Sequence, residues 1–185
     1  MLRWMLALEK GKGGPTLTRG LDGQLTAPKD NKPGTLLLEA VVTDAGAGAA
    51  GPLTGKGIVR LRHRKLEAET AEITGGKNTG KAIGSTQHGA TLKFANLNLA
   101  DTKNIKINAS AGGGAKGSQI EVRLDSPTGP IVATVDIAHT GDWGKFMQNK
   151  AKLTPTPGRH DVYLVLTHPK KSGGLMNVDW VEFSQ

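Results

Sequence analysis

The chain has 185 residues with 37% hydrophobic content, enough for one domain of ordinary size or one domain with an accessory segment. Its 26 glycines and nine prolines favour turn-rich β structure. The absence of cysteine excludes disulfides, thiolate metal sites and cysteine nucleophiles. No apolar run reaches the roughly 18 residues of a membrane span.

The formal charge of +8 is concentrated near the start of the chain. Residues 1–65 hold eleven Lys and Arg against five Asp and Glu, whereas residues 66–185 hold thirteen against eleven. A basic segment of this kind suits nucleic acid, an anionic polysaccharide or an acidic neighbouring domain. Nucleic-acid readers interleave aromatic residues with basic ones, and "RLRHRK" contains none. We therefore predict a solvated strand edge or linker there, and no nucleic-acid partner.

The first 64 residues predict an accessory segment. Residues 2–8 suggest a short helix, and the break of the apolar run at Glu9 without a cleavage site argues against a signal peptide. A hairpin turn is predicted at Asp22-Gly23, followed by strands in "TLLLEAVVTD" and "IVRLRHRKLEAE". So few strands cannot form a core alone. We expect an Ig-like β-hairpin segment that packs on the larger module or on a second copy of the chain.

From Leu66 onward the sequence predicts regular short strands separated by turns. The strands expected are "LEAETAEI", "ATLKFANLNL", "NIKINAS", "SQIEVRLDS", "IVATVDIAHT", "FMQNKAKLT", "HDVYLVLTH" and "MNVDWVEF". Turn clusters such as "SAGGGAKGS" and "TPTPGR" lie between them. This spacing, with no helical period, predicts an all-β sandwich or jelly roll over residues 65–185.

The sequence holds no enzyme signature. No serine lies in a nucleophile-elbow pattern, and no histidine pair has metalloprotease spacing. "GGGAKG" lacks the Lys-Ser/Thr and the helix that a phosphate loop requires. We therefore expect a binding protein rather than an enzyme.

Two glutamates are candidates for a hard cation. Glu67 and Glu69 are two apart on a predicted strand, so their side chains should share a face. Calcium takes six to eight oxygen ligands and mixes carboxylates with backbone carbonyls. Taken alone, the pair is more typical of an outward, solvated face.

Four motifs occur in order: "KLEAE", "IEVRLDSPTGPIVATVDIAHTGDWGKF", "GRHDVYLVLTHP" and "GLMNVDWVEF". Together they resemble a family 6 carbohydrate-binding module over about residues 65–185. The resemblance implies a lectin-like jelly roll whose first and last strands are neighbours. It also implies one structural Ca²⁺ held by Glu67, Glu69 and Asp179, with a backbone carbonyl from the "GGKNTGK" loop.

The same resemblance implies a sugar site. Trp143 of "TGDW" would stack on a pyranose ring, and Asn177 of "NVDW" would hydrogen-bond a hydroxyl. A loop tryptophan covering a core edge is the other interpretation of Trp143. Ser85 stands where such modules usually place a second aromatic, with Gln87 and His88 as polar neighbours.

The first 64 residues, through the run that begins "RGLDGQLTAPKDNKPGTLLLEAVVTD", resemble segments that precede such modules in large secreted multidomain proteins of planctomycete-type bacteria. That resemblance implies a secreted or periplasmic piece of a longer protein. The expected function is non-catalytic binding of a polysaccharide or oligosaccharide, an acidic one in view of the charge, that tethers a parent protein. The alternative is a calcium-stabilised structural or interaction sandwich that has lost its sugar cleft.

Overall fold

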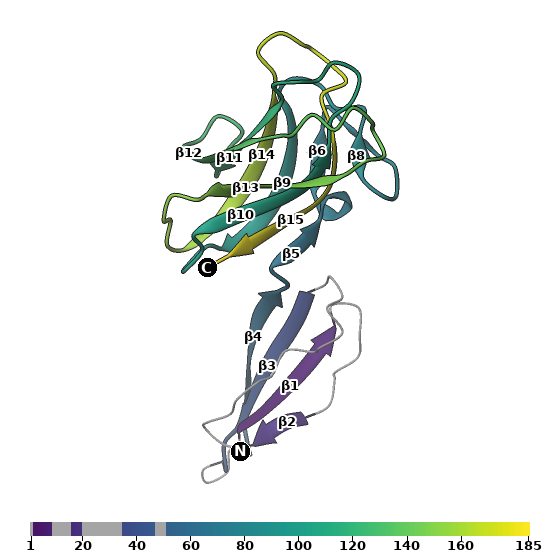
Figure 1. The fold of residues 1–185 in the computed structure, drawn as a ribbon. Coiled ribbons are helices and arrows are strands. Elements are labelled where there is room, and N and C mark those ends of the chain that lie inside the picture. The colour runs from purple at the N-terminus through teal and green to yellow at the C-terminus, as the bar shows by residue number, and fades with distance from the viewer. Residues whose placement is uncertain (1, 9–15, 20–34, 47–50) are drawn as a thin grey trace. The chain divides into compact units, whose positions relative to one another are not determined.

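The computed structural model describes residues 2–8, 16–19, 35–46 and 51–185. The chain divides into two compact units, Met1–His63 and Arg64–Gln185 (Figure 1). The described residues of both units form mainly β-strands.

The described part of the first unit is one antiparallel sheet with the strand order β2-β1-β3-β4. Its strands are β1 (Leu2–Leu8), β2 (Thr16–Arg19), β3 (Thr35–Thr43) and β4 (Thr54–Arg62). The strand predicted in "TLLLEAVVTD" is β3. The turn predicted at Asp22-Gly23 lies outside the described residues.

The helix predicted at residues 2–8 is wrong, because this segment is strand β1. β1 pairs with β3 along its whole length, from Leu2 opposite Val42 to Leu8 opposite Leu36. A helix of seven residues is marginal in water. Pairing with a neighbouring strand satisfies the same backbone groups and therefore overrides the local preference.

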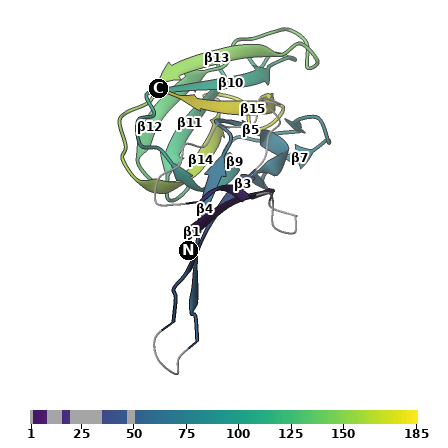
Figure 2. The ribbon, with the colours of Figure 1, turned by 90° about the horizontal axis from the view of Figure 1, so that it is seen from below.

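The second unit is a sandwich of two antiparallel sheets, as the sequence predicted (Figure 2). One sheet has the order β13-β10-β15-β8-β7, with β5 also paired to β15; the other has the order β12-β11-β14-β9-β6. The strands are β5 (Lys65–Glu67), β6 (Glu72–Thr74), β7 (Lys77–Asn78), β8 (Ile83–Gly84), β9 (Ala90–Asn98), β10 (Asn104–Ser110), β11 (Gln119–Leu124), β12 (Ile131–Asp136), β13 (Met147–Lys152), β14 (Arg159–Thr167) and β15 (Asn177–Ser184).

The core lies between these two sheets. Alternate residues of β10, β11 and β14 point into it, which is the two-residue period expected of half-buried strands. Its fully buried side chains include Ile105, Ile107, Ile120, Leu164 and Leu166. Every member of this core cluster belongs to residues 68–183, so the second unit has a core of its own.

A β-bulge on β15 changes which side chains face the core. Asn108 of β10 is opposite Trp180, but the next residue, Ala109, is opposite Val178, so Asp179 is the extra residue. Val178 and Val181 are both buried. The half-buried Trp180 instead lies under the Lys65 ammonium, 4.9 Å from the ring centroid. Simple alternation with Asp179 along the strand predicts that Trp180 is a core residue, and this prediction is wrong.

The first predicted strand of this unit, "LEAETAEI", is interrupted. β5 ends at Glu67, a 3₁₀ turn follows over Ala68–Thr70, and β6 begins at Glu72. β5 pairs with β15 and β6 with β9, so this break carries the chain from one sheet to the other. Glu67 and Glu69 therefore do not share one strand face, contrary to the prediction.

Among the residues described, no helix has the length and apolar character to cross a membrane.

Candidate carbohydrate-binding site

The loop that carries Trp143 is fixed by hydrogen bonds at one end of the sandwich. Ser110 Oγ donates to the Trp143 carbonyl oxygen at 2.6 Å, and Asn177 Nδ2 donates to the same oxygen at 2.9 Å. Ser110 and Asn177 are paired across β10 and β15. Asp142 Oδ1 accepts a bond from Gly144 N at 2.6 Å, which closes a tight turn around Trp143. The strand ends therefore set the position of the tryptophan.

The indole ring of Trp143 rests on two glycines. A Cβ added to Gly112 would lie 3.1 Å from Cδ2 and Cε2 of the ring, and one added to Gly113 would lie 3.1 Å from Cζ2. Only glycine lets a ring approach the backbone this closely. Trp143 remains 38% exposed. The glycines thus support the ring from the protein side while more than a third of the residue remains accessible to solvent, so the indole is a candidate apolar platform.

Asn177 links this platform to the opposite loop. A Cβ added to Gly84 would lie 2.9 Å from Asn177 Oδ1. This oxygen accepts no hydrogen bond from any residue that the structure describes. Asn177 is half-buried at the start of β15, so an acceptor and a second N–H of its amide remain for a ligand.

The polar residues predicted beside the site are in the loop that follows β8. Ser85 is exposed next to Gly84 and has a left-handed backbone, with φ 51°. Gln87 is exposed and bridges to Gly173. His88 Nδ1 accepts a hydrogen bond from the backbone N–H of His168 at 3.1 Å. This nitrogen therefore links two loops.

Sequence reasoning missed the supporting residues of this end. Gly112 and Gly113 were assigned only to a loop, and nothing in a glycine run shows that a tryptophan packs on it. Ser110 and Lys171 were missed as well, although Lys171 Nζ donates to the Gly113 carbonyl oxygen at 3.0 Å. Only the tertiary structure brings these residues beside Trp143.

The predicted calcium ligands lie in one region without forming a cluster. Glu67 is opposite Trp180 in the β5–β15 register, so Asp179 is a diagonal neighbour. Glu67 Oε1 pairs with Lys65 Nζ at 3.0 Å, and Asp179 Oδ2 accepts from Asn108 Nδ2 at 2.8 Å. In the described part of the chain, no three His, Cys, Asp or Glu side chains converge as a metal site requires. The carboxylates fit Ca²⁺ in donor type.

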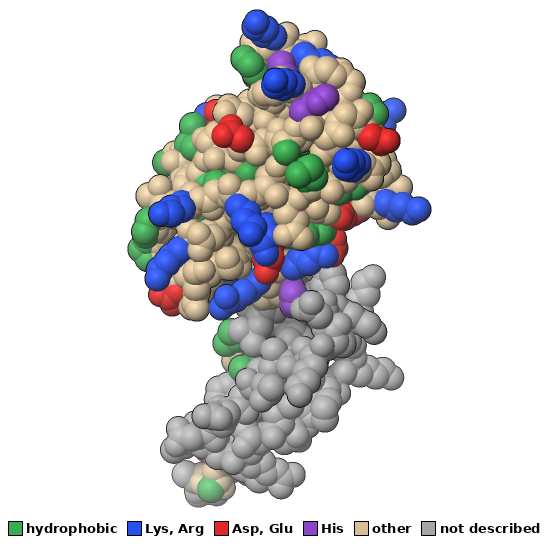
Figure 3. All heavy atoms as spheres, in the orientation of Figure 1, with side chains coloured by type: hydrophobic (Ala, Val, Ile, Leu, Met, Phe, Trp, Pro, Cys, Tyr) green, Lys and Arg blue, Asp and Glu red, His purple; other side chains and the backbone are tan. Residues whose placement is uncertain are grey.

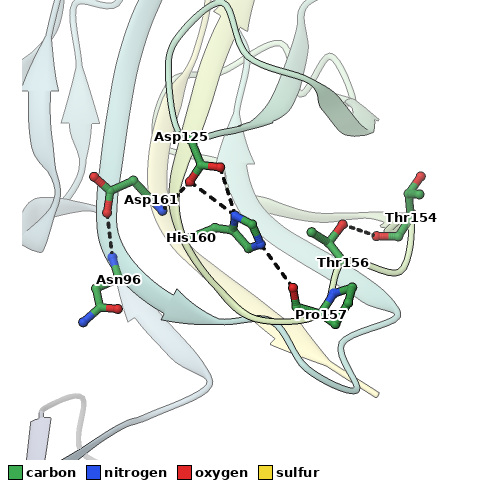
Figure 4. Close-up of polar contacts among 7 residues, drawn as sticks. All are labelled: Asn96, Asp125, Thr154, Thr156, Pro157, His160 and Asp161. Carbon is green, nitrogen blue, oxygen red and sulfur yellow. Dashed lines mark hydrogen bonds and ion pairs between the residues drawn. The ribbon is translucent and has the colours of Figure 1, made fainter.

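Charged groups with shifted pKa values lie at the other end of β14 (Figure 4). His160 Nδ1 is 3.0 Å from Asp125 Oδ2, and this hydrogen bond raises the pKa of His160. The pKa of Asp161 is lowered, first by the bond from Asn96 N at 2.8 Å and then by Lys93. β14 begins at this cluster and ends at Thr167, near the loops of the Trp143 site.

A β-sandwich that presents a supported, open tryptophan beside a free amide has the design of a carbohydrate-binding module. The family profile of "Carbohydrate binding module (family 6)" matches residues 63–185. The chain belongs to this family.

Relatives and solved structures agree with this assignment. Endo-1,4-beta-xylanase A of Thermoclostridium stercorarium is 26% identical over 130 residues, which are 66% of this chain and 22% of that protein. A family 6 module from Clostridium cellulolyticum, solved with xylose, is 31% identical with a TM-score of 0.60, over 65% of this chain and 96% of that one. A β-1,3-glucan-binding module from Bacillus halodurans is 27% identical with a TM-score of 0.59, over 65% and 95%.

A module solved with calcium and xylotriose, CBM36, shares the fold at 19% identity and a TM-score of 0.51, over 65% of this chain and 98% of that one. The chain spans about a fifth of the length of the curated relatives that it matches.

Proposed function

We propose that this chain binds a polysaccharide or oligosaccharide without catalysis and tethers a larger protein to it. The single observation that carries the proposal is the Trp143 ring, held on Gly112 and Gly113 and 38% exposed. The apolar face of a sugar ring stacks on such a surface, while the free amide atoms of Asn177 bond a hydroxyl. Ser85, Gln87 and His88 are the proposed polar neighbours.

The parent protein is proposed to be secreted or periplasmic and multidomain, of the planctomycete-type architecture that the N-terminal segment resembles. The match to only part of each relative supports this proposal. Other domains of the parent would then be partners of this chain. Its net charge of +8 favours an acidic glycan, because a basic surface raises the encounter rate with polyanions.

A structural Ca²⁺ is part of the proposal. Glu67, Glu69 and Asp179 would hold it, and their carboxylates lie on neighbouring segments of the chain. The cation would join β5 to β15 and would take no part in chemistry.

The alternative is a calcium-stabilised structural or interaction module. Ser85 favours it, since an exposed serine stands where a second aromatic would close the platform. One aromatic contact adds only about 0.5–1.5 kcal/mol beyond its buried area.

A glycan array separates the two functions. The wild type should bind one glycan class, and Trp143→Ala should lose that binding with an unchanged melting temperature. Ile131→Ala is the control, because Ile131 is 47% exposed and lies on β12, outside the site. The structural alternative would be supported if the wild type bound no glycan on the array, or if Trp143→Ala bound as well as the wild type.

A further inference from the structure

A lysine contacts one of the glycines that support the Trp143 ring. Lys171 Nζ donates to the carbonyl oxygen of Gly113 at 3.0 Å. Gly113 is one of the two glycines beneath the Trp143 ring. Gly113 therefore lies between the ammonium group and the indole, and we infer that an anionic substituent on a sugar stacked at the ring comes within reach of this charge.

The position of Lys171 is set by a buried histidine. His168 is 7% exposed, and its Nδ1 accepts from the backbone N–H groups of Lys170 and Lys171 at 3.0 and 2.8 Å. Its Nε2 lies 3.0 Å from the Lys116 carbonyl oxygen, a contact that needs a proton on Nε2. One neutral imidazole therefore ties the turn that carries Lys171 to the loop that supports the ring. The lysine is placed before any ligand binds, which lowers the entropic cost of using it.

The charge of Lys171 is not neutralised by the described part of the protein. No Asp or Glu side chain there forms an ion pair with it, and its only partner is the neutral carbonyl of Gly113. An ammonium has three N–H donors, so two remain. Lys and His side chains gather at this loop end, drawn at the top in Figure 3. Asp142, the acidic residue in the Trp143 loop, has Oδ1 engaged by Gly144 N.

We propose that Lys171 makes the site selective for sugars that carry an anionic substituent, either a uronate carboxylate or a sulfate ester. The inference rests on the proposed sugar binding at Trp143, and it adds the residue and the local charge that would recognise an acidic sugar. The ring holds the sugar face, and the two free N–H donors of Lys171 form charge-assisted hydrogen bonds to the anion. A lysine ammonium acts as a point charge, so either anion fits.

Calorimetric titration of matched ligand pairs tests this selectivity. One pair is an oligogalacturonate and its carboxyl-reduced form; the other is a sulfated galactan oligosaccharide and its desulfated form. The variants are Lys171→Gln, Lys171→Arg as the conservative form, Trp143→Ala, and Lys170→Gln as a neighbouring control. The wild type should bind the anionic member of at least one pair roughly fivefold tighter than its neutral twin, the upper range for an exposed ion pair. This preference should weaken as salt increases.

Lys171→Gln should remove the preference while keeping the affinity for the neutral twin, and Lys171→Arg and Lys170→Gln should keep it. The pair that shows the effect distinguishes uronate from sulfate. Three results would overturn the inference but leave sugar binding intact. They are an unchanged preference in Lys171→Gln, an equal loss of affinity for the anionic and the neutral ligand in that variant, and a wild type that binds the neutral ligands more tightly. Absence of binding to all four ligands would also overturn the inference, because the site would then not take these anionic sugars. Wild-type affinities in Trp143→Ala would instead refute sugar binding at Trp143, on which the inference rests.

Discussion

At the scale of single residues, the site depends on glycines as much as on the tryptophan. Gly112 and Gly113 lie under the indole of Trp143 so closely that a methyl group cannot be added without displacing the ring or the loop. Asn177 and Ser110 then fix the backbone of Trp143 through its carbonyl oxygen. The orientation of the ring is therefore encoded in residues that need not touch the ligand.

Gly112→Ala should weaken glycan binding about two- to tenfold, the range expected for one aromatic contact. Its new Cβ would lie 3.1 Å from Cδ2 and Cε2 of Trp143, so the ring must shift. Gly57→Ala is the matched control, because nothing lies within 4 Å of its added Cβ and it lies on β4, in the first unit. Titration and tryptophan fluorescence measure both variants. Wild-type affinity in Gly112→Ala would show that the ring position does not matter.

His160 should make the stability of the sandwich depend on pH. Its two ring nitrogens face acceptors, Asp125 Oδ2 at 3.0 Å and the Pro157 carbonyl oxygen at 3.3 Å, so the imidazolium satisfies both (Figure 4). The bond to Asp125 chiefly raises the pKa of His160 above its usual 6.5. A raised pKa in the folded state contributes stability fully below about pH 6.5, and this contribution is lost as pH rises through the folded value.

His160→Gln should therefore melt about 1–3 °C below the wild type at pH 5.5, with the difference closing by about pH 8.5. The exposed His139 provides the control variant His139→Gln, which should track the wild type at both pH values. A difference that grows towards high pH would contradict the assignment of a charged His160.

At the scale of elements, the bulge on β15 has two consequences. Because of the bulge, the side chains of Val178, Val181 and Phe183 all point into the core. Asp179 is the extra residue of the bulge, and its carboxylate accepts a hydrogen bond from Asn108. Bulges re-aim side chains at functional edges of sheets. The bulge therefore lets a strand with an aspartate in its middle remain well packed.

Chelation should lower the melting temperature of the wild type by several degrees. A ligand that binds only the folded state at a hundredfold excess over Kd contributes about 2.7 kcal/mol. Asp179→Asn should melt lower in calcium buffer and should not respond to EDTA, whereas Asp101→Asn should respond like the wild type. An unchanged wild-type melting curve after EDTA would contradict a structural calcium.

Much of the second unit could be predicted from its sequence, because alternating strands and glycine- or proline-rich turns are local signals. Residues 2–8 could not, since their strand pairs with β3, about thirty residues away. The face of the sheet to which Trp180 points depends on a bulge, and the alternation of residues along a single strand does not show where a bulge occurs. The motifs predict Asn177 and Trp143 as site residues, and a hydrogen bond joins the Asn177 amide to the Trp143 carbonyl oxygen. Gly112 and Lys171 could be found only in the tertiary structure.

At the scale of the whole molecule, the buried core cluster belongs entirely to the second unit. We expect residues 64–185 alone to melt cooperatively, close to the temperature of the full chain. Val42 and Ile58 of the first unit are exposed apolar side chains. The sequence predicts that the apolar faces of this segment pack on the module or on a second copy of the chain. Truncation should then lower solubility, measured by light scattering. Non-cooperative melting would contradict a self-contained core, and unchanged solubility would show that the first unit is an independent appendage.

Nuclear magnetic resonance can detect whether a glycan binds on the Trp143 ring. The chain has three tryptophans, and the Trp143→Ala variant assigns one of their indole N–H signals. Titration with a glycan that the array identifies should shift the Trp143 indole signal and the Asn177 side-chain amide, while the Trp180 signal stays in place beneath Lys65. Binding that leaves the Trp143 indole signal unmoved would show that the glycan does not stack on this ring.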